Sequence, residues 1–253
     1  MKEKIICVIP ARYGSERLPG KVLLKINEKS ILQRVYERAK LCKKFFSEII
    51  IATDDDRIVE ECRKIGAKVV LTSPYCKSGS DRVAEVAKKI DCDIVVNLQA
   101  DEPYIPKEAI EKPIIELIKN KKEYVVTSLT KIRKKEELYD SNIVKAVIDK
   151  NNYALYFSRS LIPYPRIYFS EDNLIKNRKV IFYKHIGIYV FRKNFLLKFA
   201  SLPLSFLENI EKLEQLRIIE NGYKIKTVIV KNDSPSVDSL EDIKRIMKWK
   251  KYA

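Results

Sequence analysis

The first half of the chain alternates between short apolar runs and longer segments in which apolar residues recur at helical spacing. The apolar runs are typical of buried strands, and they lie at residues 4–10, 48–54, 68–72 and 93–103. The segments between them predict amphipathic helices at residues 30–42, 56–67 and 80–90. Strands that alternate with helices in this way indicate an α/β fold with a mostly parallel central sheet and helices on both faces.

Two of these helices carry recognisable end signals. Ser30 stands where an N-cap is expected, and Gly66 stands where the second helix is expected to stop.

The second half of the chain is less regular. Its apolar runs predict strands at residues 123–132, 143–149, 184–191 and 224–230. Helical spacing predicts one amphipathic helix over residues 208–222, closing at Gly222, and a last helix within residues 236–251. The stretch "NYALYFSRSLIPYPR" is aromatic and rich in turn residues, and residues 164–183 predict a long excursion from the sheet.

Length and composition indicate one domain, residues 1–253, with a sizeable core: 46% of the residues are hydrophobic and 33% are charged. No apolar run approaches the ~20 residues of a membrane span, so we expect no membrane insertion. The five cysteines include no CxxC pair, and their odd number favours reduced thiols in a cytoplasmic protein. Cys7 and Cys92 lie in or beside apolar runs and are expected in the core.

A net charge of +16 raises the possibility of a nucleic-acid partner. The lysines are spread along the chain, however, and no basic and aromatic residues interleave as in single-strand-binding proteins. We therefore expect no specific nucleic-acid partner. A non-catalytic basic protein that binds nucleic acid remains the alternative from another functional class.

The N-terminal loop "VIPARYGSERLPGKV" combines three cations with two of the chain's six glycines. It is not a P-loop, because five residues separate Gly14 from Gly20 and a valine follows Lys21. It is not a dinucleotide fingerprint either, because no glycine lies two residues after Gly14. Arg12, Arg17 and Lys21 fit a strongly anionic ligand, and a solvated turn remains the alternative.

Polar residues also follow the other first-half strands. They are Thr53-Asp54, the Ser78-Gly79-Ser80 stretch, and Gln99, Asp101 and Glu102. Ligands of parallel α/β sheets bind beyond the carboxyl ends of the strands, so these residues predict a site at one edge of the sheet.

The single histidine, His185, limits the chemistry that is available. Ser-His-Asp and Cys-His arrangements would need it as their base, and Cys/His zinc sites of the usual composition are excluded. A metal would need carboxylate ligands, which suits Mg²⁺ and makes Asp101, Glu102 and Asp238 the candidates. A basic loop and carboxylates together indicate phosphoryl or nucleotidyl transfer, whereas helix capping is the alternative role of an isolated aspartate.

Seven motifs in order along nearly the whole chain carry a resemblance to a known family. They are "IPARYGSERLPGKVL", "SGSDR", "NLQADEP", "NYALYFSRSLIPYPR", "KHIGIYVFRK", "LEQLRIIENGYKI" and "VDSLEDI". The chain resembles the 3-deoxy-manno-octulosonate (Kdo) cytidylyltransferases of lipopolysaccharide biosynthesis. Acylneuraminate cytidylyltransferases share the first motif with changes, but usually have Lys-Arg and Lys-Asn in the loop where this chain has Glu16-Arg17 and Gly20-Lys21-Val22.

The resemblance implies a Rossmann-like nucleotide-diphospho-sugar transferase fold. Residues of about 1–125 would form a nucleotide-binding half. Residues of about 126–253 would bind the sugar and include a small dimerisation subdomain, which implies a homodimer. The implied reaction joins CTP and Kdo into CMP-Kdo and releases diphosphate, with Mg²⁺ as cofactor.

The resemblance also implies roles for individual residues. Arg12, Lys21 and Ser15 would bind the triphosphate, with Lys21, Arg12, Asp101 and Asp238 as the catalytic set and both aspartates on the metal. Cytosine and ribose would lie against Ala11, Ser78, Gly79 and Gln99. The sugar acid would meet Arg159, His185, Tyr189, Glu211 and Gln215, although His185 and Tyr189 could equally be packed strand residues.

Two points stay open. Ala100 replaces the glycine that commonly precedes Asp-Glu-Pro in the family, and its methyl group could narrow the approach to the nucleotide. A related sugar acid, such as 8-amino-Kdo or an acylneuraminate-like acid, is the alternative substrate within the enzyme class.

Overall fold

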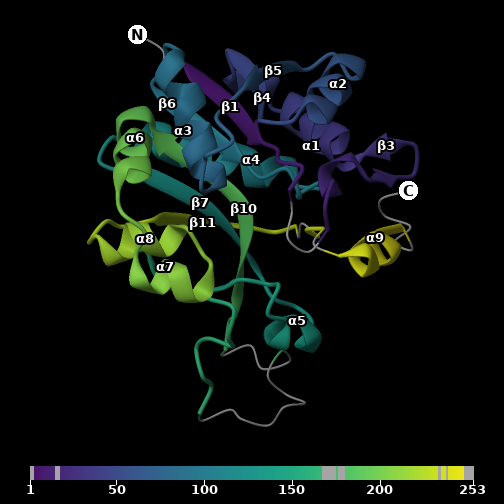
Figure 1. The fold of residues 1–253 in the computed structure, drawn as a ribbon. Coiled ribbons are helices and arrows are strands. Elements are labelled where there is room, and N and C mark those ends of the chain that lie inside the picture. The colour runs from purple at the N-terminus through teal and green to yellow at the C-terminus, as the bar shows by residue number, and fades with distance from the viewer. Residues whose placement is uncertain are drawn as a thin grey trace.

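A central sheet with strand order β11-β7-β10-β6-β1-β4-β5 organises the chain, and helices cover both of its faces (Figure 1). The computed structural model describes residues 3–14, 18–166, 175, 180–232, 235–237 and 239–247. The four predicted first-half strands pair with one another in parallel, as expected; they are β1 (Ile5–Pro10), β4 (Glu48–Thr53), β5 (Lys68–Leu71) and β6 (Ile94–Leu98).

The second half adds three strands to this sheet. β7 (Val125–Lys131) and β11 (Lys226–Val230) run parallel to each other, and β10 (Tyr183–Arg192) lies antiparallel between β6 and β7. The prediction of a mostly parallel sheet is therefore confirmed.

A short antiparallel pair extends the sheet beside the start of β10. It consists of β8 (Lys145–Ile148) and β9 (Ala154–Ser158). β9 lies inside the aromatic stretch for which the sequence indicated only turns.

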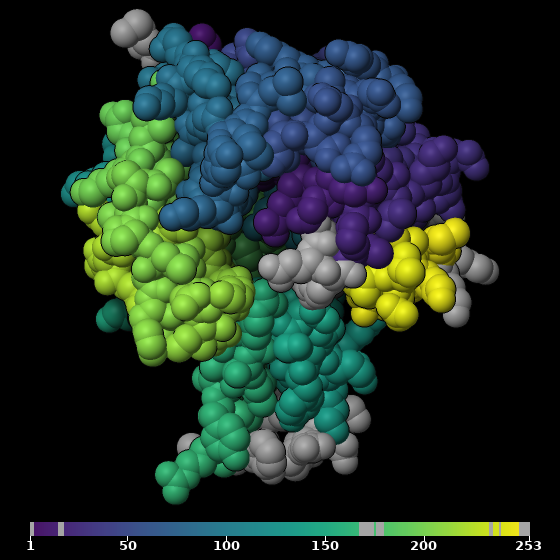
Figure 2. Space-filling view, viewed as in Figure 1, coloured from purple at the N-terminus to yellow at the C-terminus, as the bar shows by residue number. Residues whose placement is uncertain are grey.

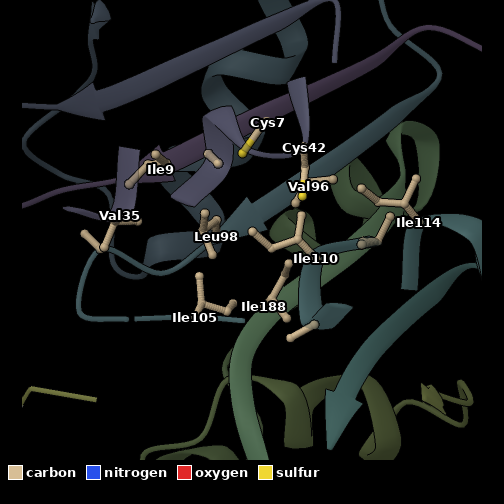
Figure 3. Close-up of a cluster of buried hydrophobic side chains, with 14 of the residues drawn as sticks. Cys7, Ile9, Val35, Cys42, Val96, Leu98, Ile105, Ile110, Ile114 and Ile188 are labelled. Atoms are coloured by element: carbon tan, nitrogen blue, oxygen red, sulfur yellow. The ribbon is translucent and has the colours of Figure 1, made fainter. Parts of the chain in front are cut away.

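Alternating side chains of β1 divide the core into two layers, because successive residues of a strand point to opposite faces. Cys7 and Ile9 pack toward α1 (Ile31–Lys40), α2 (Asp56–Lys64) and α4 (Lys107–Lys119), as Figure 3 shows in part. Ile6 and Val8 pack toward the other layer, whose helices are α3 (Gly79–Lys89), α6 (Lys193–Ser201) and α8 (Gln215–Glu220). Cys7 and Cys92 are free, buried thiols, as predicted.

The end signals read from the sequence are present. The Ser30 side chain accepts a hydrogen bond from the Gln33 amide at 3.0 Å and caps α1. Gly66 follows α2 with a φ of +64°. Helices α4, α5 (Lys135–Tyr139) and α6 were not predicted; in α4, Pro113 interrupts the sequence pattern although the helix continues through it.

The single helix predicted over residues 208–222 is wrong. The structure has two helices, α7 (Phe206–Glu211) and α8, separated by Lys212 in the left-handed region with φ 53° and ψ 45°. A buried ion pair holds α8 back against α7: Arg217 donates to both carboxylate oxygens of Glu208 at 2.7 and 2.6 Å. This tertiary contact requires the turn that helical spacing alone does not reveal.

The C-terminal helix returns to the first half of the chain. α9 (Leu240–Met247) packs through Ile243 and Ile246 against the small β2–β3 hairpin (Lys25–Ile26 and Lys29–Ser30), beside the N-terminal region in Figure 1. A separate small cluster of Ile132, Leu138 and Phe182 lies at the α5 region, which extends below the sheet in Figure 1. Within the described residues, no helix is long and apolar enough to cross a membrane.

Candidate active site

A cavity of about 990 Å³ lies at the carboxyl ends of β1 and β6. Its lining comes from both halves of the chain: the ends of these strands, the start of α3, the first residues of β10, the α5 region, and α7 with α8. Figure 2 shows the surface hollowed between the purple and blue first half and the light-green helices α7 and α8, with the teal segment below. The edge of the sheet that the sequence indicated is therefore a real concave site.

Lys21 and Asp101 form an ion pair in this cavity. The Lys21 ammonium lies 2.9 Å from Oδ2 of Asp101, and only 8% of the Lys21 surface is exposed. A short 3-10 helix, Lys21–Leu23, starts after Gly20, whose φ of 70° suits glycine, and it holds the lysine inward. The structure thus joins two of the predicted catalytic residues that are 80 positions apart in the sequence.

A backbone hydrogen bond brings the C-terminal segment to Asp101. The amide of Val237 donates to the carbonyl oxygen of Asp101 at 3.0 Å. Asp238, Ser15 and Arg17 lie outside the described residues, so their predicted roles stay predictions. Among the residues that are described, no group of three or more His, Cys, Asp or Glu side chains is arranged as a metal site.

The start of α3 forms one wall of the cavity. Ser78 caps the helix in a capping box: its hydroxyl accepts from the Asp81 amide at 3.1 Å, and its own amide donates to Asp81 at 2.9 Å. A Cβ at Gly79 would lie 3.5 Å from the ring of Pro10, so the helix passes close to the end of β1. Arg12, Ser78, Gly79 and Gln99 all line the cavity, whereas Ala11 is fully buried and does not.

Gly187 on β10 allows a close approach of two side chains from the end of β6. A Cβ at this position would lie 2.7 Å from Oε1 of Gln99 and 3.0 Å from Oε1 of Glu102. The Gly187 amide donates to Glu102 Oε1 at 3.0 Å, and its carbonyl accepts from the Gln99 amide at 3.0 Å. The Glu102 side chain and the Gln99 backbone are therefore fixed against β10, and both residues line the cavity.

Arg159 follows β9 and is held by backbone carbonyls. Its Nε donates to the carbonyl of Glu211 and its Nη1 to the carbonyl of Ser141, each at 2.9 Å. The Glu211 carboxylate does not line the cavity; it accepts from the Ser158 hydroxyl at 2.6 Å and from the Arg159 amide at 3.0 Å. Arg159 thus faces the cavity, and Glu211 fixes it from behind.

Lys145 supports the Arg159 backbone from the interior of the protein. Its ammonium is fully buried and donates to the backbone carbonyls of Asp140, at 2.9 Å, of Ile143, at 2.7 Å, and of Arg159. Burial lowers the pKa of Lys145 to about 8. Because the three carbonyls belong to two separate segments, this side chain ties Arg159 to the loop that follows α5.

His185 and Tyr189 lie one behind the other on β10. His185 lines the cavity, and the centroid of its ring lies 5.1 Å from that of Tyr189, which is 1% exposed and does not line the cavity. Burial lowers the pKa of His185 to about 3 and raises that of Tyr189 well above its usual value. The Tyr189 hydroxyl is buried without a hydrogen-bond partner among the described residues.

Glu214 is a cavity residue that the sequence reasoning missed. Its carboxylate accepts from the Ser80 hydroxyl at 2.8 Å, and burial raises its pKa. Glu211 and Gln215 were selected by their positions in the motifs of the resembling family, and a continuous helix would place them on one face, one turn apart. The break at Lys212 instead brings Glu214 and Gln215 to the cavity and turns Glu211 toward Arg159. The acidic residue next to Gln215 was visible in the sequence, but nothing local indicated the break.

A family model described as cytidylyltransferase matches residues 6–226. The chain belongs to the cytidylyltransferase family. It is 47% identical over 246 residues to a 3-deoxy-manno-octulosonate cytidylyltransferase of Thermodesulfovibrio yellowstonii, covering 94% of each chain. A protein of the same name from Francisella philomiragia is 47% identical over 245 residues, covering 95% of this chain and 96% of that one.

Solved structures agree with this placement among the cytidylyltransferases. A CMP:2-keto-3-deoxy-manno-octonic acid synthetase, complexed with CTP, superposes with a TM-score of 0.85 at 39% identity and covers 96% of this chain and 97% of that one. An inositol-1-phosphate CTP transferase from T. maritima, at 15% identity and a TM-score of 0.63, shares the fold. The expected nucleotidyltransferase fold is therefore confirmed.

Ala100 departs from the glycine expected in cytidylyltransferases of this kind. It lines the cavity and is 7% exposed. The described non-glycine residues with positive φ are Asn27, Asn152 and Lys212, so the backbone at Ala100 needs no glycine. Whether the methyl group restricts the nucleotide stays a prediction.

Proposed function

We propose that this chain transfers the cytidylyl group of CTP to the sugar acid Kdo. The anomeric hydroxyl oxygen of the sugar would form a bond to the α-phosphorus of CTP as the bond from that phosphorus to the β-phosphate oxygen breaks. Diphosphate leaves, and the hydroxyl proton is released. The product, CMP-Kdo, would serve lipopolysaccharide biosynthesis in the cytoplasm.

The observation that carries this proposal is one cavity whose lining holds both predicted sets of binding residues. Lys21, Arg12 and the start of α3 would bind the nucleotide, and Arg159, His185 and Gln215 would bind the sugar acid. About 990 Å³ is at the upper end of the range for ligand sites, which suits a nucleotide together with a sugar. The names of the relatives at 40–47% identity and the CTP bound in the related structure support the same pair of substrates.

At the nucleotide end, the cations would neutralise the triphosphate. Lys21 is preorganised by burial and would exchange part of its contact with Asp101 for a phosphate oxygen. Ser15 and the backbone near Ala11 would complete this wall, while Ser78, Gly79 and Gln99 would meet the ribose and the base. A helix N-terminus such as that of α3 favours negative charge.

The residues present fit a Mg²⁺ ion beside Asp101. Its carboxylate is a hard oxygen donor that faces the cavity and already stabilises a cation, the Lys21 ammonium, at 2.9 Å. Mg²⁺ is usually held by one or two carboxylates together with substrate phosphates, so Asp101 and Asp238 would suffice. When bound, the ion would offset the charge at the α-phosphate and lower the pKa of the attacking hydroxyl.

At the sugar end, Arg159 is suited to the carboxylate of the acid. Backbone carbonyls orient its guanidinium without neutralising it, and its Nη2 has no partner among the described residues. Gln215 and Glu214 would meet hydroxyl groups, with Glu211 and Tyr189 positioning Arg159 and His185.

Diphosphate release tests this proposal directly. The protein should release diphosphate from CTP and Mg²⁺ with Kdo, and much more slowly with 8-amino-Kdo or N-acetylneuraminate. A preference for either of those acids would replace Kdo as the substrate, and no release with any acid would reject the activity.

We also propose a homodimer formed through the second half of the chain. Tyr139, Leu155 and Tyr164 are about half exposed or more in this region, and β8 is the one described strand that pairs with β9. Light scattering at working concentration should give twice the chain mass of 29.5 kDa, and a monomer would contradict the proposal.

A further inference from the structure

Thr127 on β7 lies fully buried opposite an irregularity of β10. The register between the two strands shifts between Ile186 and Tyr189, and Thr127 pairs with Tyr189 directly after the shift. The Thr127 hydroxyl donates to the carbonyl oxygen of Ile188 at 2.6 Å. A bulge of this kind re-aims side chains, and here it brings His185 next to the same hydroxyl.

The hydrogen bond between the Thr127 hydroxyl and His185 can therefore have only one direction. Its oxygen lies 2.8 Å from Nε2 of the histidine. A threonine hydroxyl carries one hydrogen, and the Ile188 carbonyl, which can only accept, takes it. Toward Nε2 the oxygen must then accept, so Nε2 carries the ring hydrogen.

The second ring nitrogen of His185, Nδ1, is available to a ligand. His185 lines the cavity, and no described residue hydrogen-bonds to Nδ1. Two aromatic rings pack against the imidazole ring: Phe157 meets it edge-on at 5.6 Å between centroids, and the centroid of Tyr189 lies 5.1 Å away. Burial also lowers the pKa of His185 to about 3, so near neutral pH the ring is uncharged and Nδ1 keeps its lone pair.

We propose that Thr127 is a positioning residue that locks His185 in its Nε2-protonated form, so that Nδ1 accepts a hydrogen bond from a hydroxyl of the sugar acid. The identity of the ligand as a sugar acid rests on the proposed function, whereas the tautomer follows from the geometry alone. A lone pair repels a carboxylate. His185 consequently selects a hydroxyl, and the carboxylate of the substrate falls to Arg159.

Nitrogen-15 NMR of the imidazole tests the lock, because the chain has a single histidine and its signals need no assignment. In the wild type at neutral pH, Nε2 should show the shift of a protonated nitrogen and Nδ1 that of a lone-pair nitrogen. Thr127→Val should mix or invert the two signals, and Thr127→Ser, which keeps the hydroxyl, should restore them. Thr130→Val is the matched control: Thr130 is buried on the same strand and donates to the carbonyl of Val230 at 3.3 Å.

Steady-state kinetics give a second test of the role of Thr127. Thr127→Val should raise KM for the sugar acid about 5- to 10-fold, the factor of one lost hydrogen bond, and leave KM for CTP nearly unchanged. Thr130→Val should change neither of the two KM values.

Several results would overturn the lock. They are a wild-type spectrum with the proton on Nδ1, an unchanged spectrum in Thr127→Val, or equal rises in both KM values. If Thr127→Val does not fold, the wild-type and Thr127→Ser spectra still decide the matter. If the wild type turns over no sugar acid, the proposed function fails while the spectra continue to test the tautomer.

Discussion

Lys21 is the residue whose environment is hardest to explain without an anionic ligand. Its ammonium is largely shielded from solvent, and it forms an ion pair with the Asp101 carboxylate at 2.9 Å. Lys21→Ala should lower kcat/KM for CTP by roughly 10²-fold or more, because charge-assisted contacts to phosphate in a shielded site are strong. Lys25→Ala, an exposed change four residues on, is the control. A folded Lys21→Ala enzyme with near-full activity would show that the loop is not the phosphate clamp.

The low pKa of His185 predicts how the free energy of unfolding changes in acid. Its pKa is about 3 in the folded protein and about 6.5 for a free imidazole, so between these values the unfolded chain binds the extra proton. Stability from this group is complete above about pH 6.5 and is lost as the pH falls toward 3, by up to about 1.4 kcal/mol per pH unit. Urea unfolding at pH 4 and 7 should therefore show a smaller pH effect in His185→Gln than in the wild type. Equal pH effects would mean that the ring is not protected from protonation.

The break between α7 and α8 is a feature of the element scale. Lys212 adopts a left-handed conformation that costs a non-glycine residue about 1 kcal/mol. Lys212→Gly should therefore leave stability unchanged or raise it by up to about 1 kcal/mol in urea unfolding. Glu60→Gly, an exposed change in the middle of α2, should lower it by a similar amount. Destabilisation by both changes would favour one continuous helix.

Arg159 depends on two elements, because β9 ends next to it and α7 supplies the carbonyl that orients it. Arg159→Ala should raise KM for the sugar acid more than KM for CTP, since no other group replaces its planar fork. Glu211→Gln should act in the same direction but more weakly, because the Glu211 carbonyl remains. Steady-state kinetics with each substrate varied in turn measures both effects, and equal changes for the two substrates would indicate a structural role.

At the scale of the whole molecule, the Asp101 region is where the N-terminal loop, β6 and the C-terminal segment meet. Asp101→Asn and Asp238→Asn should each lower kcat by about 10²-fold or more if both carboxylates hold one metal ion. Residues that act as a unit are strongly non-additive, so the double variant should be little worse than either single one.

Two measurements separate this from a structural effect. Thermal unfolding should be nearly unchanged, and CTP binding by calorimetry should persist because Arg12 and Lys21 remain. Losses of activity that multiply in the double variant would mean that the two carboxylates act independently.

Much of the fold could be predicted from local patterns. The four first-half strands and the helices between them were placed to within a few residues, because buried strands and amphipathic helices impose different periods on the sequence. Ser30 and Gly66 marked helix ends because capping depends on neighbouring residues only. The order of the motifs was enough to indicate the family, and the strand ends indicated the edge of the sheet that holds the site.

Tertiary structure decided what depends on distant partners. The antiparallel direction of β10, the break at Lys212 and the ion pair between Lys21 and Asp101 all follow from contacts between segments far apart in the chain. The same holds for Glu214 in place of Glu211 at the cavity and for the hydroxyl of Thr127 beside His185. The sequence determined which residue types stand at the carboxyl ends of the strands, because local periodicity places those ends. Which side chains face the ligand was settled only by packing, because a single turn or bulge redirects every side chain that follows it.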